Sequence, residues 1–436
     1  MIDTNIYFDE KGPTKTIRKS KHPENQFNFQ DSDNIPAYLC IYLAIPKEQQ
    51  DSFNSKYIAL EQEYKLQNNF QASELKGEKL LKSVHIVQDI KKNRAKFFND
   101  VIELIHTSNS KIQLSILDKS QVLVTSRLKS WLFQIEKLSS DTINIHLLLY
   151  TLIKYLRTED YQLGLPFTNA LSNSSLSTRQ ILDILKQSLD AFITNHHDIA
   201  RMSQQIETYR QLISIINQYP GDNDIIPINF TFPTDQLAFG LDLLVLADNP
   251  KDWQKDPEMF KDTITIYLDA DAPTNGYQEN GYSHLKSGLD SKCYPGLRAC
   301  DILAVLLGKL ISHIDVEDHY DNNNPGEQKK LSAKFFKSLS SEQIKLVNNI
   351  YSLIFESNNK YSLLCGTFAD YIYIFQALLE TLLEYSGDNP ENDHLFRAEK
   401  LMGLKFSEME EVNNIRIFNL KKSTEELIND GIFKPL

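Results

Sequence analysis

The chain has 436 residues, of which 41% are hydrophobic and 24% charged, a composition typical of a globular protein large enough for more than one subdomain. The formal net charge of −12 argues against passive coating of nucleic acid or membranes, although a nuclease with a local basic track remains compatible with it. The four cysteines form no CxxC pair, so neither a thiolate zinc site nor a disulfide framework is indicated.

Hydropathy places further limits on the class of protein. No stretch approaches the roughly 18 apolar residues that a membrane-spanning helix needs, and the best run, residues 302–311, is interrupted by Lys309. The N-terminus has no basic segment followed by an apolar run, so we expect no signal peptide. With few, scattered cysteines, these features favour a cytoplasmic location.

Strand-like and helix-like patterns alternate in the first 125 residues. The chain opens with an apolar run, residues 6–8, that leads directly into Asp9 and Glu10. The later patterns predict, in chain order, a strand at 37–45, helices at 48–66 and 87–108, and a strand at 111–120 that contains Asp118.

The second quarter of the chain carries the helical period almost throughout, with predicted helices at 126–138, 143–156 and 178–218. Strand and helix patterns then return, at 226–232, 235–247, 263–270 and 297–314, before a mostly helical tail. The order predicts one discontinuous α/β core. We divide the core into a first part at residues 1–125 and a second part at residues 225–318. A helical insertion at residues 126–224 separates them, and a helical C-terminal extension follows at residues 319–436.

Four acids stand where folding could gather them. Asp9 and Asp118 follow apolar strand patterns, Glu74 precedes a predicted helix, and Asp301 lies within an apolar helical run. A charge in such a run is seldom buried without a partner or a metal. Carboxylates are the ligands that Mg²⁺ and Mn²⁺ prefer, and two such ions about 3.5–4 Å apart can promote phosphodiester hydrolysis.

Each of these acids also has an ordinary structural interpretation. Asp118 could cap the helix that follows it, Glu74 could start one, and Asp9 could be a solvated turn residue before Gly12. The basic residues of the stretch 15–22 could likewise form a solvated loop.

Five motifs, taken in order, resemble a bacterial family known as domain of unknown function 3800. "IYFDEKG" resembles the family's "YxDESG", "ELKG" its "ExKG", and "LSILDKS" its "ViDK". "INFTFPTDQ" loosely resembles its "iifDe" strand, and "YPGLRACDILAVLLGKLI" is similar to its "GlQlADllag" helix. The similarity covers about residues 1–120 and 225–315. Lys11 stands where the family has Ser, and "RACD" replaces the usual "QlAD".

The resemblance implies an RNase H-like fold with a nuclease-like metal centre, and family members often lie among mobile-element and phage-defence genes. On this basis we expect Asp9 to bridge two Mg²⁺ or Mn²⁺ ions, Glu74 and Asp118 to hold one ion each, and Asp301 to complete the second. Glu10 should point to the opposite face of its strand if the strand continues. Four residues are expected to support or substitute for the ligands, namely Glu10, Lys76, Lys119 and Asp235.

The leading hypothesis is therefore a metal-dependent nuclease that cleaves RNA or DNA, with a basic track for phosphates formed by Lys15, Arg18, Lys19 and Lys21. Two alternatives remain open, a catalytically degenerate scaffold that binds a protein partner and a metal-dependent nucleotide phosphohydrolase. The helical regions, with an all-round apolar segment at 361–385, predict a homodimer or a protein-partner interface.

Overall fold

The computed structural model of the chain describes residues 4–11, 37–139, 143–156, 161–226, 241, 261–270, 272, 274–317, 331–355, 364–365, 371–385 and 400–405. Two predicted elements, the strand at 226–232 and the helix at 235–247, lie outside this part of the chain except for Ile226 and Leu241.

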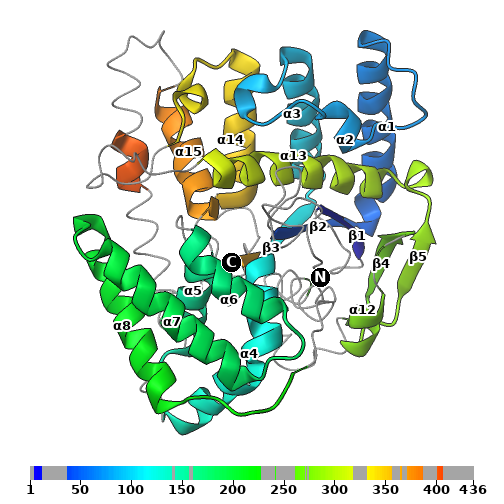
Figure 1. The fold of residues 1–436 in the computed structure, drawn as a ribbon. Helices are drawn as coiled ribbons and strands as arrows, with labels where there is room; N and C mark the ends of the chain where they lie inside the picture. The colour runs from blue at the N-terminus through cyan, green and yellow to red at the C-terminus, as the bar shows by residue number, and fades with distance from the viewer. Residues whose placement is uncertain are drawn as a thin grey trace, which may run out of the picture.

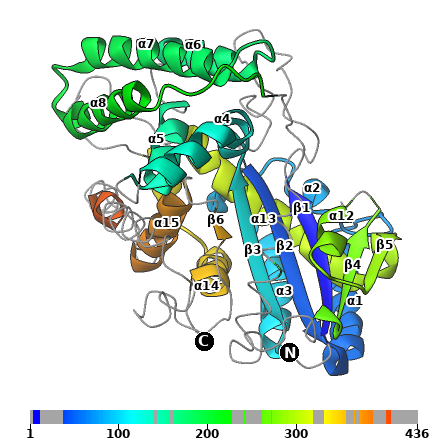
Figure 2. The same ribbon diagram turned by 90° about the horizontal axis from the view of Figure 1, so that it is seen from below.

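A mixed β-sheet forms the centre of the molecule, with the strand order β5-β4-β1-β2-β3-β6. The strand β2 runs antiparallel to both of its neighbours, whereas β1 and β4, β4 and β5, and β3 and β6 pair in parallel. Figure 2 shows β3, β2, β1 and β4 side by side. The strands are β1 (Thr4–Lys11), β2 (Ala37–Pro46), β3 (Lys111–Asp118), β4 (Ile264–Asp269), β5 (Leu285–Leu289) and β6 (Leu364–Cys365).

The two faces of the sheet have separate hydrophobic cores because side chains alternate along each strand. On β1, Ile6 and Phe8 face a core that contains Tyr42 and Tyr277. Tyr7 faces the opposite core, which is the larger one and is covered by helices. The carboxylate of Glu10 raises the pKa of Cys40 and of Tyr277, although burial is the larger cause for both. Glu10 therefore lies on the side opposite to Tyr7, as its position in the strand predicts.

One long helix, α13 (Pro295–Glu317), crosses this larger face against β1 and β2 (Figure 1). Proline suits the first position of a helix, where its missing N–H is not needed. A second layer of helices shares the core around the apolar side chains of α13. These helices are α1 (Gln50–Gln67), α2 (Gly77–Leu80), α3 (Lys92–Thr107), α14 (Ser341–Phe355) and α15 (Tyr371–Tyr385). Of this layer, α1, α2 and α15 contact α13 itself. The described helices of the C-terminal extension thus belong to the same core as the sheet.

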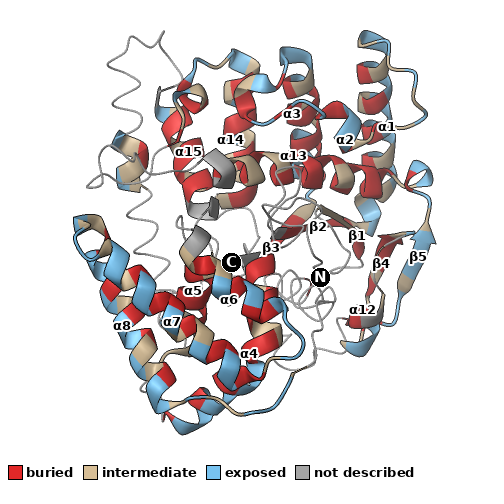
Figure 3. Ribbon diagram, in the orientation of Figure 1, coloured by how far each residue is buried: buried red, intermediate tan, exposed pale blue. Residues whose placement is uncertain are grey.

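The helical insertion forms a unit with its own hydrophobic core. Among the sheet residues whose side chains the structure describes, Tyr38 is the one that contributes to that core. In Figure 3 its buried residues lie along the facing sides of the helices. The first of these helices begins directly after β3, so the predicted boundary at residue 126 falls within a helix. The helices are α4 (Lys119–Leu138), α5 (Ile145–Leu156), α6 (Tyr161–Ser172), α7 (Thr178–His196) and α8 (Ser203–Gln218).

The structure differs from the sequence-based prediction in two local details. The predicted helix 178–218 is two helices, α7 and α8, with a short 3-10 turn between them at Ala200–Met202. The polar segment between β4 and α13 contains α12 (Asn275–Glu279) and the edge strand β5. None of the helices in the described ranges has the length and apolar character needed to cross a membrane.

Two glycines allow α13 to pack unusually closely against its neighbours. A Cβ atom added to Gly296 would lie 2.4–2.6 Å from ring atoms of Tyr7, including its Cγ. A Cβ atom added to Gly77 would lie 2.7 Å from Cβ of Val305 and 3.0 Å from the carbonyl oxygen of Asp301. The glycines of "YPGLRACD" and "ELKG" are therefore required by the packing of α13 on β1 and of α2 on α13.

The substitution Gly296→Ala tests the contact between α13 and β1. Alanine favours a helix by up to about 1 kcal/mol over glycine, yet the overlap with Tyr7 should outweigh this gain and reduce the free energy of unfolding by about 1–3 kcal/mol. Urea denaturation measures the change.

A double-mutant cycle provides the control. Tyr7→Ala is destabilising by itself because a buried ring is lost, but Gly296→Ala should then add little, since the ring that it contacts is absent. Additive losses would contradict the proposed overlap.

Candidate active site

Asp9 lies near the end of the central strand β1, on the face covered by α13. It follows Tyr7 by two residues and therefore shares its face. Its Oδ1 accepts a hydrogen bond of 2.8 Å from the backbone N–H of Glu10. The pKa of Asp9 is raised well above its usual range, first by burial and then by the negative charges of Asp301, Glu10 and Asp269.

Asp301 reaches this region from α13. The thiol of Cys300 donates a hydrogen bond of 3.4 Å to the carbonyl oxygen of Tyr7, which fixes this turn of the helix beside β1. The backbone N–H of Gly77 donates to Oδ2 of Asp301 at 2.8 Å. Burial raises the pKa of Asp301, while the Gly77 N–H and the charges of Lys76 and Lys11 oppose the rise. The charge of Asp301 in turn raises the pKa of Asp9, so the two carboxylates lie within electrostatic range of each other.

Asp269 is a third carboxylate at this site and was not among the predicted residues. Phe8 pairs with Leu268 in the parallel β1–β4 ladder, so Asp9 and Asp269 follow on adjacent strands at the next position. Tyr7 and Tyr267, two residues earlier on each strand, stack with their ring centroids 4.7 Å apart. The strand pattern at 263–270 could have identified Asp269, because parallel neighbouring strands end at the same edge of a sheet.

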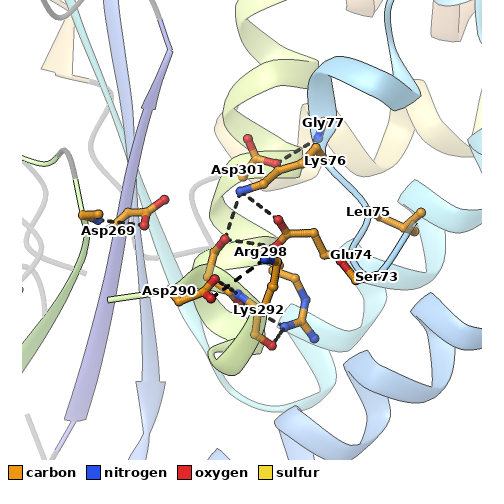
Figure 4. Close-up of polar contacts among 12 residues, drawn as sticks. Ser73, Glu74, Leu75, Lys76, Gly77, Asp269, Asp290, Lys292, Arg298 and Asp301 are labelled. Atoms are coloured by element: carbon orange, nitrogen blue, oxygen red, sulfur yellow. Dashed lines mark hydrogen bonds and ion pairs between the residues drawn. The ribbon is translucent and has the colours of Figure 1, made fainter. Parts of the chain in front are cut away.

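Glu74 lies in the extended segment before α2 and is held from η5 (Ser291–Cys293), the turn before α13 (Figure 4). The hydroxyl of Ser291 donates to Oε2 of Glu74 at 3.0 Å. The ammonium of Lys76 donates to the same hydroxyl at 2.9 Å and lies 3.5 Å from Oε1 of Glu74. The negative charge of Glu74 also raises the pKa of Asp301. Glu74 therefore belongs to the same charged cluster, on the Asp301 side.

A buried ion pair fixes the segments that carry Glu74 and Asp301. The Nε atom of Arg298 lies 3.0 Å from Oε2 of Glu61, and the two side chains are only 6% and 4% exposed. The other carboxylate oxygen of Glu61 accepts the backbone N–H of Leu75 at 2.8 Å. Arg298 also donates to the carbonyl oxygens of Ser291 and Lys292, at 3.1 and 2.6 Å. Removing one partner of such a pair leaves a buried uncompensated charge, so the pair ties α1, the Glu74 segment and α13 together.

Two lysines border the carboxylates on another side. Lys11, two residues after Asp9 on β1, forms an ion pair with the exposed carboxylate of Glu78. The ammonium of Lys309 on α13 lies 3.6 Å from the other oxygen of Glu78. Burial and the neighbouring charge of Lys309 lower the pKa of Lys11, while Asp301 and Asp9 oppose that change. The carboxylates thus have a cationic border that could contact an anionic substrate.

Asp118 lies apart from this cluster. It stands four residues beyond Leu114, the position on β3 that pairs through Ile41 with Asp9, and four residues span roughly 13 Å along a strand. Its carboxylate caps α4 by accepting the backbone N–H of Ser120 at 2.7 Å. The sequence had left a capping role open for Asp118, and the register favours that interpretation over a shared metal site.

The remaining predicted residues fall into two groups. Lys119 accompanies Asp118, with its ammonium 5.1 Å from the ring centroid of Tyr38. Burial lowers the pKa of Lys119 to about 7. The other predicted residues lie outside the described part of the chain, namely Lys15, Arg18, Lys19, Lys21 and Asp235. Their assignment stays a prediction.

The donor atoms at Asp9, Asp269 and Asp301 suit a hard divalent cation. The carboxylates of Asp301, Glu10 and Asp269 all raise the pKa of Asp9, and the charge of Lys11 interacts favourably with Asp9. A cation between Asp9 and Asp301 would relieve this repulsion. In the described ranges, no three histidine, cysteine or acidic side chains are gathered tightly enough to form a complete metal cage. Mg²⁺ does not require one, because it commonly binds through one or two carboxylates and keeps several waters.

Comparison of the chain with protein-family models, with curated proteins and with solved structures gave no match in any of the three.

The raised pKa values make a prediction about stability and pH. A carboxyl whose pKa is higher in the folded than in the unfolded protein lowers the free energy of unfolding when it ionises. This loss develops as the pH rises from about 4, the usual pKa of aspartate, through the pKa of the folded protein. Asp9→Asn removes this penalty, so at pH 8 it should increase the free energy of unfolding, by roughly 0.5–2 kcal/mol. The gain should vanish towards pH 4. Thermal denaturation at several pH values measures it.

The matched control is Asp183→Asn, at an exposed position on α7. A similar gain in both variants, or a gain for Asp9→Asn that is equal at pH 4 and pH 8, would show that repulsion at Asp9 is not the cause.

Proposed function

We propose that this protein is a divalent-cation-dependent nuclease of RNase H-like fold that hydrolyses phosphodiester bonds in RNA or DNA. The observation that carries the proposal is the raised pKa of Asp9, because its neighbouring charges come from carboxylates on β4 and α13 as well as on β1. Perturbed carboxylates of this kind concentrate at functional sites. The similarity of five motifs to the domain of unknown function 3800 family points in the same direction.

The arrangement of the sheet supports the RNase H-like part of this proposal. The core strands have the order β3-β2-β1-β4-β5, with β2 antiparallel to its neighbours and the first acid on the central strand β1. Asp301 approaches that strand from a helix that crosses the sheet.

The residues can be given distinct chemical roles. Asp9 and Asp301 would hold the cation, and Asp269 would strengthen the negative field that attracts it. A bound Mg²⁺ or Mn²⁺ neutralises phosphoryl oxygens and makes an attacking water more acidic. Lys11, Lys76 and Lys309 contribute positive charge beside the carboxylates. These lysines would attract and orient the phosphates of a polyanionic substrate.

A cleavage assay tests the proposal. Labelled single- and double-stranded RNA and DNA, and free nucleotides, are incubated with the purified chain and Mg²⁺ or Mn²⁺. We expect cleavage of a polynucleotide that chelation abolishes. Asp9→Asn and Asp301→Asn should each reduce the rate by at least about 100-fold, because losing a ligand should exceed the 10–100-fold effect of losing a residue that only supports one.

The control for this assay is again Asp183→Asn, which should keep the original rate. Hydrolysis of nucleotides alone would favour a phosphohydrolase. No hydrolysis with either ion, or full activity of Asp9→Asn, would contradict the proposal.

A further inference from the structure

Lys76 places a positive charge inside the acidic cluster, which consists of Asp9, Asp269, Asp301 and Glu74. Its ammonium is hydrogen-bonded to Oγ of Ser291 at 2.9 Å and lies 3.5 Å from the carboxylate of Glu74. The same charge lowers the pKa of Asp301. Figure 4 shows the Lys76 side chain directed back towards Glu74 and Asp301 and away from the bulk of α2. Its side chain is 35% exposed, so the ammonium is partly shielded from water.

The backbone on both sides of Lys76 is fixed. Leu75 is fully buried and its N–H is held by Glu61. Gly77 packs against Val305 and its N–H is held by Asp301. Lys76 itself has an extended backbone, with φ −104° and ψ 134°. Alternate side chains of an extended segment point in opposite directions, so Glu74 and Lys76 share one side while Leu75 enters the core. The ammonium is therefore placed by the fold.

The cluster consequently has two unlike halves. In the half around Asp9, the carboxylates of Asp301, Glu10 and Asp269 raise its pKa. The cation that interacts with Asp9, Lys11, is itself in an ion pair with Glu78. In the half around Glu74, the fixed ammonium already lies at ion-pair distance from a carboxylate. A divalent cation would be attracted to the first half and repelled from the second, because a like charge is already present there.

We propose that the site binds a single divalent cation, between Asp9 and Asp301, and that the ammonium of Lys76 supplies the positive charge that a second cation would otherwise provide. Glu74 then holds Lys76 through its ion pair and through Ser291, and does not act as a metal ligand. This inference rests on the proposed function, which requires a cation at Asp9 and Asp301, and it replaces the two ions expected from the sequence.

Calorimetric titration of the full chain with MnCl₂ tests the stoichiometry directly. We expect one Mn²⁺ per chain for the original protein and for Lys76→Arg, which keeps the charge. Lys76→Met removes the charge at similar length, so Glu74 becomes available and two Mn²⁺ should bind. Lys79→Met, at an exposed lysine on α2, is the matched control and should bind one.

Circular dichroism establishes that each variant is folded, and electron paramagnetic resonance gives a second readout, since two neighbouring Mn²⁺ ions show spin coupling that a single ion lacks. Two ions in the original protein would overturn the inference and leave the proposed nuclease intact. One ion in folded Lys76→Met would also overturn it. No binding to the original protein would contradict both this inference and the metal dependence of the proposed function.

Discussion

The close contact between α13 and the central strand β1 is the constraint on which the candidate site depends. Asp9 and Asp301 are separated by almost the whole core sequence, and their charges interact because Gly296 lets the helix approach the ring of Tyr7. The thiol of Cys300 extends this contact with a hydrogen bond to the Tyr7 carbonyl. Gly77 likewise lets α2 pack closely against α13, and its N–H donates a hydrogen bond to Asp301. A bulkier residue at either glycine would separate the acids.

This packing places the negative charges of Asp9 and Asp301 near each other. Contacts outside the acidic cluster stabilise the arrangement. Arg298 and Glu61 form a buried pair that holds the backbone around Glu74 and Ser291. Tyr57 covers the guanidinium of Arg298, whose carbon lies 5.5 Å from the ring centroid. The carboxylates themselves oppose folding at neutral pH, because burial and mutual repulsion raise their pKa values. A site that lowers stability in this way is expected to be retained for its function.

The sequence predicted those features that depend on local pattern. The apolar run before Asp9 predicted a buried strand, and strand alternation placed Glu10 on the other face. The acid within the apolar helix, Asp301, is partly buried and accepts the N–H of Gly77. Asp118 ends a strand just as Asp9 does, yet only the register shows that it lies about four residues, or roughly 13 Å, further along the sheet. Asp269 and β5 were missed because their positions follow from strand pairing, and β5 is largely polar and exposed. The Arg298–Glu61 pair joins residues far apart in the chain, so no local pattern could predict it.

The central claim is that Asp9 and Asp301 share a cation. The most direct test is anomalous diffraction from crystals of the protein soaked in Mn²⁺, measured at the manganese absorption edge. The account predicts an anomalous peak between the carboxylates of Asp9 and Asp301, with Lys76 still in contact with Glu74. A map with no peak at that position, or with the ion bound at Asp118 instead, would contradict it.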